Sequence, residues 1–415
     1  MKFKINKNEF LKGLLQVGKI IPIKHTNPIF VNIKLELTTD SLILTGSNGD
    51  LSITTSIPFF RNNQEIIRDV QLGSILANSD ILCNIVKRLD GDEIAFDVLD
   101  DNEARIEVDD KASFNLHCID ANEYADLDFS FKGVKVILDA SEIANVVSQV
   151  SFAASIKNVK PVLTGVNIEG SGSKINFVAT DSARLAKKEV EAEELNGVFW
   201  TTSVRVFEEI GKSITDPDNI SLQFKELKGE ELNGVFNTTV PVRTFQEIAR
   251  SITDEDKITL YINDRRILVE LKDTIISSVL LPGTYPNVKN IIPKNFLYTL
   301  EVDANDLIKT IETANVFSAS TGEKGATIRC YMSQENVVFR CSSDQNGNSS
   351  VILNLFKYTG ERLEISFKCE YVLSAVKALK TSEVLLCFQG EMKPFVIIGK
   401  NDPSVIQLLT PVKTH

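Results

Sequence analysis

The stretch Val86-Lys87-Arg88-Leu89, followed by Ile94-Ala95-Phe96, has two counterparts further along the chain. They are Ala249-Arg250-Ser251-Ile252 with Ile258-Thr259-Leu260, and Val376-Lys377-Ala378-Leu379 with Val384-Leu385-Leu386. In all three, a basic residue precedes the apolar end of a helical run, and a short polar turn leads into an apolar run. The pattern predicts a helix followed by a strand, three times over.

Three predicted helix starts repeat in the same way. Each has a capping-type residue, an acidic residue and then an apolar pair: Asn8-Glu9-Phe10-Leu11, Ser141-Glu142-Ile143-Ala144 and Asn305-Asp306-Leu307-Ile308. Asn8, Ser141 and Asn305 are therefore the expected helix caps. Between the helices, stretches such as Ile33–Leu37 alternate apolar and polar residues, which is typical of antiparallel strands with one wet face.

The middle repeat is longer than the first, and a tandem duplication explains the excess. Glu193-Glu194-Leu195-Asn196-Gly197-Val198-Phe199 returns 37 residues later as Glu230-Glu231-Leu232-Asn233-Gly234-Val235-Phe236. We therefore predict an α+β protein of three repeated domains, each with two helices and antiparallel sheets. The expected domains are residues 1–132, 133–297 and 298–415, with the duplicated insertion near 193–229. No Gly/Ser-rich linker separates them, which favours rigid packing.

The composition indicates a soluble globular protein, because hydrophobic residues make up 43% of the 415 residues and charged residues 24%. Apolar runs such as Val384–Phe388 fall far short of the roughly 20 residues that span a bilayer. Polar residues between Lys4 and Lys12 interrupt any signal-peptide core. We expect a cytoplasmic protein that makes no use of a membrane.

The residues that usually carry catalysis are scarce. The chain has three histidines and six cysteines, no zinc-type spacing, no phosphate-binding glycine motif and no nucleophile elbow. The cysteines lie mostly in apolar runs, so we predict buried, reduced thiols. These observations disfavour an enzyme, and no metal or cofactor is expected.

Basic residues at matched helix positions suggest a shared anionic partner. Lys87, Arg250 and Lys377 each lie near the end of a predicted second helix, and Lys7, Lys12 and Lys19 lie on or next to the first. One interpretation is that a cation in the last turn complements the helix dipole. The other is that several helices present positive charge to duplex DNA. The net charge of −11 disfavours a wholly basic surface and leaves room for a local one.

Several spaced motifs then match one family. They are Met1-Lys2-Phe3-Lys4, Thr26-Asn27-Pro28-Ile29, Leu44-Thr45-Gly46, Pro161–Val166, Ala179–Leu185, Leu281–Pro286 leading to Ile291-Ile292-Pro293, and Gln407–Thr414. On these residues the chain resembles the bacterial sliding clamp, the beta subunit of the replicative DNA polymerase III, along nearly its whole length.

The resemblance implies a non-catalytic processivity factor, cytoplasmic and associated with the nucleoid. Members of the family are head-to-tail homodimers whose six domains close a ring around duplex DNA, with helices inside and sheets outside. The implied partners are duplex DNA, a second copy of the chain, the replicative polymerase catalytic subunit, the clamp loader ATPase, and other polymerases and repair proteins. The DNA-facing candidates are Lys24, Lys157 and Lys160, together with the helix cations Lys87, Arg250 and Lys377.

The resemblance also implies a hydrophobic groove for partner peptides between the second and third domains. Its expected wall is Leu163, Thr180, Ser182, Arg184, Leu185, Pro286 and Ile291 from the second domain, and Tyr371, Met392, Pro394, Leu408, Leu409, Pro411 and Val412 from the third. Ala183 replaces the usual histidine of the family, and Asn290 and Lys413 stand where many members have arginine. These departures affect the polar rim of the groove and its partner preference.

The ring-closing surface is expected to join Phe114 and Leu116 of one copy to Val316 and Phe317 of the other. The alternative is that these four are ordinary core residues.

Within the duplication, Thr238–Arg243 is closer to the family than Thr201–Arg205, so the second copy is expected to be the native helix. Two other functions stay open: a clamp-like paralogue that binds peptides without encircling DNA, and a β-rich hydrolase.

Overall fold

The computed structural model describes residues 1–100, 103–108, 112–157, 159–197, 235–252, 257–319, 326–343 and 346–413. They form two compact units. Unit 1 holds the described residues of 1–137, 196–222 and 250–280, and unit 2 holds those of 138–195, 223–249 and 281–415. Residues 198–229 of the predicted insertion lie outside the described residues.

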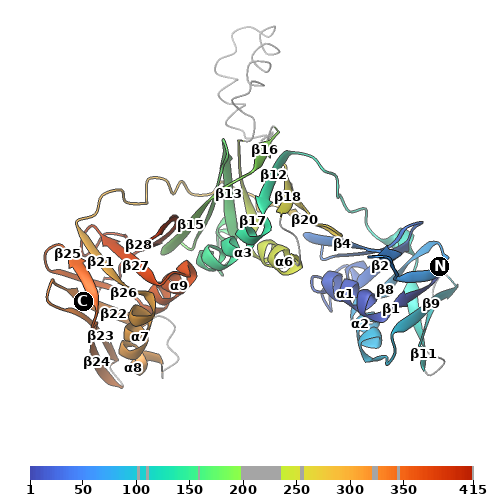
Figure 1. Cartoon of the computed structure of the whole chain (residues 1–415), viewed down its shortest axis with the longest axis horizontal. Helices are drawn as coiled ribbons and strands as arrows, with labels where there is room; N and C mark the ends of the chain where they lie inside the picture. Colours follow the sequence, from blue (N-terminus) through green and yellow to red (C-terminus); the bar gives the residue numbers. More distant parts are fainter. Residues whose placement is uncertain are drawn as a thin grey trace, which may run out of the picture. The chain divides into compact units, whose positions relative to one another are not determined.

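Unit 1 is built on a long antiparallel sheet, with α1 (Lys7–Gly18) and α2 (Ser79–Arg88) packed against each other (Figure 1). Among the described residues the sheet has the strand order β16-β12-β18-β19-β20-β4-β3-β2-β8-β11-β10-β9-β1-β7. The strands are β1 (Lys2–Asn6), β2 (Asn32–Leu37), β3 (Ser41–Ser47), β4 (Leu51–Pro58), β7 (Ile67–Gln71), β8 (Gly73–Asn78), β9 (Glu93–Asp100), β10 (Glu103–Val108), β11 (Ala112–Ile119), β12 (Val134–Asp139), β16 (Glu194–Asn196), β18 (Lys257–Ile262), β19 (Arg266–Glu270) and β20 (Thr274–Val279). A short hairpin, β5 (Phe60–Arg61) with β6 (Gln64–Glu65), and the 3-10 turns η1 (Pro28–Val31) and η2 (Ala121–Glu123) complete it.

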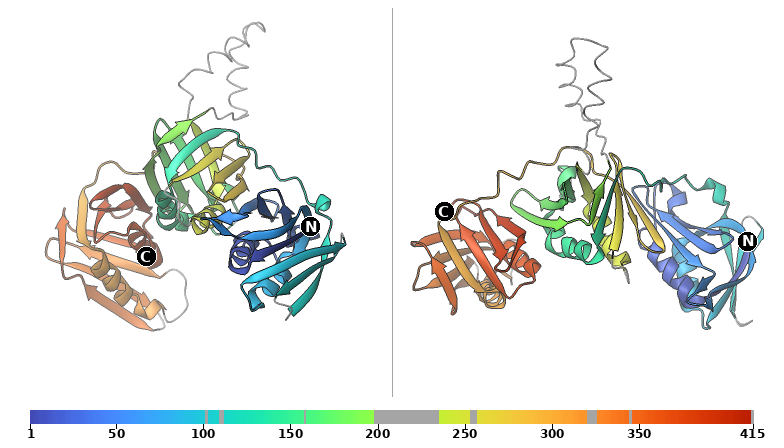
Figure 2. Two further views of the ribbon diagram at one scale, coloured as in Figure 1. Left: turned by 45° about the vertical axis from the view of Figure 1, so that its right-hand side comes forward. Right: turned by 45° about the horizontal axis from the view of Figure 1, so that its top comes forward.

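Unit 2 contains two antiparallel sheets, and its helices α7 (Ala304–Ala314) and α9 (Cys369–Leu379) lie side by side (Figure 2). In the described part of the chain, the strand orders are β17-β13-β14-β15-β29-β28-β27-β21-β25 and β24-β23-β22-β26. The strands are β13 (Gly165–Ser171), β14 (Lys174–Thr180), β15 (Arg184–Glu191), β17 (Phe236–Pro241), β21 (Tyr298–Asp303), β22 (Thr327–Met332), β23 (Val337–Ser343), β24 (Gly347–Ile352), β25 (Phe356–Thr359), β26 (Leu363–Lys368), β27 (Glu383–Phe388), β28 (Phe395–Gly399) and β29 (Asp402–Leu409). The other elements are α3 (Ala140–Gln149), α6 (Val242–Ser251), α8 (Val316–Ala319), η3 (Ser151–Ala153) and η4 (Pro161–Thr164).

The predicted α+β architecture of three repeated domains is confirmed. The two helices of each repeat are α1 with α2, α3 with α6, and α7 with α9. The predicted strands after the second helices are β9, β18 and β27. In β2, Ile33, Leu35 and Leu37 are buried whereas Lys34 and Glu36 are half-buried, as the alternation predicts.

Within each unit, strands from neighbouring predicted domains pair directly. In unit 1, β4 pairs with β20 and aligns Thr55 with Thr274. In unit 2, β15 pairs with β29 and aligns Leu185 with Leu408. Backbone hydrogen bonds therefore continue one sheet into the next across each seam, which satisfies strand edges that would otherwise be exposed.

Each of the three predicted helix caps is wrong by two positions. The cap of α1 is Asn6, whose side chain accepts hydrogen bonds from the backbone N–H groups of Asn8 and Glu9 at 3.0 and 3.2 Å. Asp303 caps α7 in the same way, and Asp139 occupies the cap position of α3 without a side-chain hydrogen bond. Asn8, Ser141 and Asn305 therefore lie inside the first turn of each helix. There the backbone N–H group of each residue needs an acceptor, and its side chain is not the cap.

The two copies of the duplicated segment are both used, in different places. Glu194–Asn196 of the first copy, which we expected within the insertion, form β16 next to β12. The second copy forms β17 and α6, and buries Phe236, Phe245 and Ile248. In the described residues, the middle repeat thus takes β16 from the first copy and β17 and α6 from the second.

The thiols agree with the prediction of buried cysteines. All six are free, and all except the half-buried Cys83 are buried. Burial raises the pKa of Cys118 and Cys387 to about 11, so both thiols stay protonated and unreactive at neutral pH. Within the described residues, no helix has the length and apolar character needed to cross a bilayer.

The cap assignment can be tested with two neighbouring substitutions. Asn6→Ala removes the acceptor for two N–H groups, so the free energy of unfolding should fall by about 1 kcal/mol in urea titrations. Asn8→Ala, on an exposed side chain inside the helix, should change it by less than about 0.5 kcal/mol. The reverse order of effects would show that Asn8 is the cap.

Candidate functional site

The seam between β15 and β29 forms the floor of the predicted peptide site. Leu163, Leu185 and Leu408 belong to one apolar cluster with Val178 and Tyr285, and all five are at most 9% exposed. Val396 is also in this cluster, and Val162, Val288, Ile292 and Phe296 pack against it. The three predicted leucines therefore form a buried floor, whereas we had expected them in the wall.

The exposed apolar residues of the site lie in two loops. Ile291, in the segment that follows Tyr285, is 47% exposed, and Met392, in the turn before β28, is 57% exposed. Isolated exposed apolar side chains are common on protein surfaces. Ile291 precedes Ile292, which packs against the apolar cluster, and Met392 precedes β28, which contributes Val396 to that cluster. Exposed apolar side chains of this kind can anchor a hydrophobic peptide.

A rigid turn connects β14 to β15. The Asp181 carboxylate accepts hydrogen bonds from the N–H groups of Ala183 and Arg184 at 2.9 and 3.0 Å. The Thr180 hydroxyl donates to the Arg184 carbonyl at 2.6 Å, and the Ser182 N–H donates to that hydroxyl at 3.1 Å. Ser182 has a φ of 79°, in the left-handed region that few non-glycine residues adopt. These bonds hold the turn in one conformation.

The C-terminal segment is bound to this turn. The N–H and the hydroxyl of Thr410 both donate to the Ala183 carbonyl, at 3.0 and 2.8 Å. The Val412 N–H donates to the Ser366 carbonyl at 2.7 Å. Pro411 and Val412 are half-buried as a result. The segment is therefore part of the site's framework.

Arg184 connects three parts of unit 2. Its guanidinium forms an ion pair with Asp181 at 3.0 Å, and both side chains are at most 16% exposed. It lies over the ring of Tyr371 at 4.6 Å and that of Phe152 at 5.4 Å, and donates to the Ser374 hydroxyl at 3.3 Å. Because the planar guanidinium is stacked and paired, Arg184 positions the site and offers little free charge to a ligand.

The fourteen predicted groove residues differ in exposure. The buried ones are Leu163, Thr180, Leu185, Leu408 and Leu409; the half-buried ones are Arg184, Tyr371, Pro394, Pro411 and Val412; and the exposed ones are Ser182, Pro286, Ile291 and Met392. Sequence reasoning missed Val178, Tyr285 and Val396 in the floor. Tyr285 lies inside the quoted motif Leu281–Pro286, and burial raises its pKa well above the usual range.

All six predicted DNA-facing residues are exposed: Lys24, Lys87 and Arg250 in unit 1, and Lys157, Lys160 and Lys377 in unit 2. Lys87, Arg250 and Lys377 lie in the last turns of α2, α6 and α9. This position is compatible with the helix dipole and with a shared anionic partner. Lys377 also pairs with Glu312 at 2.7 Å, but both side chains are more than half exposed, so the pair stabilises little.

The predicted ring-closing residues lie near open sheet edges. Phe114 and Val316 are 41% and 57% exposed, Phe317 is half-buried, and Leu116 is buried at 6%. In the described residues β11 pairs with β8 only at Cys118 and Ile119, and β24 has β23 as its one neighbour. Of the four residues only Leu116 is buried, so the alternative of ordinary core packing applies to Leu116 and not to the other three.

Arg184→Ala should destabilise unit 2 by about 2 kcal/mol, because it removes a mostly buried charge partner and two ring contacts. Lys174→Ala is the control, since its ion pair with Glu189 is exposed by 54% and 34% and should be worth less than about 1 kcal/mol. Urea unfolding measures both. Equal effects of the two substitutions would contradict a connecting role for Arg184.

Comparison with known proteins covers the whole chain. The family models for the DNA polymerase III beta subunit match residues 1–128 with the N-terminal domain, 137–228 and 193–287 with the central domain, and 289–413 with the C-terminal domain. The central model matches twice and overlaps at the duplicated segment.

Individual relatives agree with these matches. The beta sliding clamps of Bacillus subtilis and Staphylococcus epidermidis are each 27% identical, with all of both chains covered. The crystal structure of the Bacillus subtilis sliding clamp superposes with a TM-score of 0.87 at 27% identity, and the Streptococcus pneumoniae beta chain with 0.85 at 25%, both over the full length of each chain. With all three domains matched in order, the chain belongs to the DNA polymerase III beta subunit family, the beta sliding clamps.

Proposed function

We propose that this chain is a DNA sliding clamp, a non-catalytic processivity factor that encircles duplex DNA. The observation that carries the proposal is the full-length match of all three repeated domains to beta sliding clamps. A ring holds DNA by topology, so its direct contacts with the phosphates can stay weak and independent of sequence. The protein works in the cytoplasm, on the nucleoid.

The ring requires a head-to-tail pair of chains. Two heterologous interfaces that close on themselves are a permitted symmetric solution. The open edge of β11, with exposed Phe114, and the open edge of β24, with 57% exposed Ile352, are suited to pair between two copies. Val316 and Phe317 in α8 add apolar area next to β24, because α8 contacts β24 directly.

The apolar cluster around Leu163, Leu185 and Leu408 is the proposed docking site for partners. An extended peptide with two or three apolar side chains would contact Ile291 and Met392 above this floor. The partners are the replicative polymerase catalytic subunit, the clamp loader ATPase, and other polymerases and repair proteins. With Ala183, Asn290 and Lys413 on the rim, the peptide is held mainly by apolar contacts.

Phe114→Glu should break the ring, because it places a charge on the proposed interface. Light scattering at micromolar concentration should give a mass near twice 46.1 kDa for the unsubstituted chain and 46.1 kDa for the variant. After loading, the unsubstituted protein should stay on circular DNA and leave it on linearisation. Leu99→Glu, at a side chain that is 40% exposed on β9, is the matched control and should remain dimeric.

A monomeric mass for the unsubstituted chain, or equal retention on circular and linear DNA, would overturn the ring. In that case peptide binding without encirclement, as in a clamp-like paralogue, would describe the protein.

Deletion of residues 411–415 should abolish binding of a hydrophobic clamp-binding peptide and leave the dimer intact. The deletion removes Pro411 and Val412, two of the predicted groove residues, together with the Val412 hydrogen bond to Ser366. Deletion of Thr414 and His415 alone is the control and should preserve affinity. Calorimetric titration measures both, and unchanged affinity after the longer deletion would refute the location of the site.

A further inference from the structure

The chain has three methionines, and they differ in exposure. Met332 lies in β22, is 2% exposed and belongs to the core cluster of unit 2. Met1 precedes β1 and is half-buried. Met392 is 57% exposed, in the turn before β28. Of the three thioethers, that of Met392 is therefore the most open to an oxidant in solution.

Met392 also lies next to the proposed peptide site. Its turn, Glu391–Lys393, is exposed throughout and leads directly into β28. Val396, four residues after Met392, is 3% exposed and belongs to the apolar cluster of the site. Because four residues of extended chain span at most about 14 Å, the Met392 side chain stays close to that cluster. The same thioether is thus open to solvent and placed beside the apolar floor.

The cysteines compete poorly for an oxidant. A peroxide reacts with the thiolate form of cysteine, so a raised pKa slows the reaction. Five of the six thiols are buried, and burial raises the pKa of Cys118 and Cys387 to about 11 and that of Cys369 to about 12. Burial also raises the pKa of the half-buried Cys83. A thioether has no proton to lose, so Met392 reacts without any such activation.

We propose that Met392 is a site of reversible sulfoxidation, and that the sulfoxide weakens the docking of partner peptides. The inference rests on the proposed function and adds a regulation of the same site. In the forward step the Met392 sulfur attacks a peroxide such as hydrogen peroxide. A sulfur–oxygen bond forms and the O–O bond breaks, and the second oxygen leaves as water. Sulfur loses two electrons, and the peroxide gains them.

The reverse step needs a reductant of the dithiol class. A methionine sulfoxide reductase supplied with a dithiol removes the oxygen as water, while the dithiol becomes a disulfide. The thioether of Met392 is then restored. Because the side chain is 57% exposed, a reductase can reach it in the folded protein.

The sulfoxide changes the docking surface and spares the core. Its S=O group is polar and hydrated, and an apolar peptide that covers the group must remove that water. In the free protein the Met392 side chain is already in contact with solvent, so its oxidation costs little folding free energy. The same reaction at Met332 would place a polar group in the core of unit 2. Oxidation of Met392 should therefore act on peptide affinity and leave stability unchanged.

The test uses the full-length chain and a hydrophobic clamp-binding peptide that contains neither methionine nor cysteine. After treatment with hydrogen peroxide and its removal, mass mapping locates the added oxygen and calorimetric titration gives the affinity. One oxygen atom should appear on Met392 and none on Met332, with an unchanged melting temperature. The affinity should fall about tenfold. Methionine sulfoxide reductase with dithiothreitol should restore it.

Two substitutions serve as controls. Met392→Leu removes the sulfur, so its affinity should be the same before and after peroxide. Met332→Leu should lose affinity on oxidation as the unsubstituted chain does. The rate of the loss should be the same at about pH 6 and about pH 8, whereas oxidation of a thiol accelerates as the pH rises.

Sulfoxide at Met392 with unchanged affinity would overturn the proposal, and so would a loss of affinity that Met392→Leu shares. An unmodified Met392, under conditions that oxidise free methionine, would overturn it as well. Failure of the unoxidised, unsubstituted protein to bind the peptide would refute the proposed docking site and, with it, this inference. The dimer mass and the retention on circular DNA report the ring separately, because neither depends on peptide binding.

Discussion

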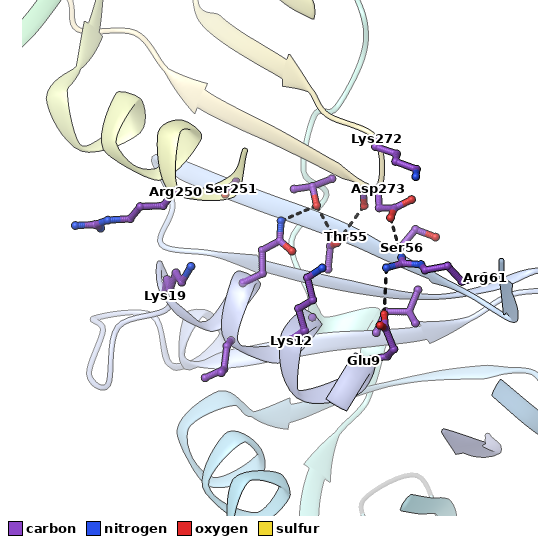
Figure 3. Close-up of a pocket in the computed structure, with 15 residues that line it drawn as sticks. Glu9, Lys12, Lys19, Thr55, Ser56, Arg61, Arg250, Ser251, Lys272 and Asp273 are labelled. Atoms are coloured by element: carbon purple, nitrogen blue, oxygen red, sulfur yellow. Dashed lines mark hydrogen bonds and ion pairs between the residues drawn. The ribbon is translucent and has the colours of Figure 1, made fainter. Parts of the chain in front are cut away.

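Backbone pairing across the predicted domain boundaries is the constraint on which the proposed peptide site depends. The β4–β20 seam in unit 1 and the β15–β29 seam in unit 2 satisfy strand edges that an isolated domain would expose to water or to other chains. Leu185 and Leu408, aligned across one, belong to the apolar cluster of the proposed peptide site, whereas Thr55 and Thr274, aligned across the other, share a hydrogen bond at a polar pocket of unit 1 (Figure 3). The same construction thus gives one apolar seam and one polar seam.

Much of this organisation follows from repetition in the sequence. Periodic apolar residues predict the paired helices and the strands after them, and the matched repeats predict three α+β domains. The helix caps were misplaced because Asn6 and Asn8 are both good capping types. Only the backbone conformation decides which of them stands before the first turn. A local pattern cannot supply that information.

The candidate sites, too, could be predicted only in part from the sequence. The resemblance implies Leu163, Leu185 and Leu408 as groove residues, which stays a prediction, but alternation alone could not show that Val178 and Val396 share their cluster. The contacts of Arg184 were also beyond local patterns, since Phe152 and Tyr371 are distant in sequence. Local patterns also could not predict the polar pocket at the β4–β20 seam, because its lining comes from four separate segments of the chain.

The hybrid use of the duplicated segment has a genetic consequence. Because residues 193–199 and 230–236 are identical, excision of 37 residues yields the same chain wherever the cut begins between 193 and 200. In each case only a glycine and a valine would separate the residues that form β16 from those that form β17. Slippage between the two copies during replication of the gene would therefore remove the extra length in one step, and leave every described element of the middle repeat encoded.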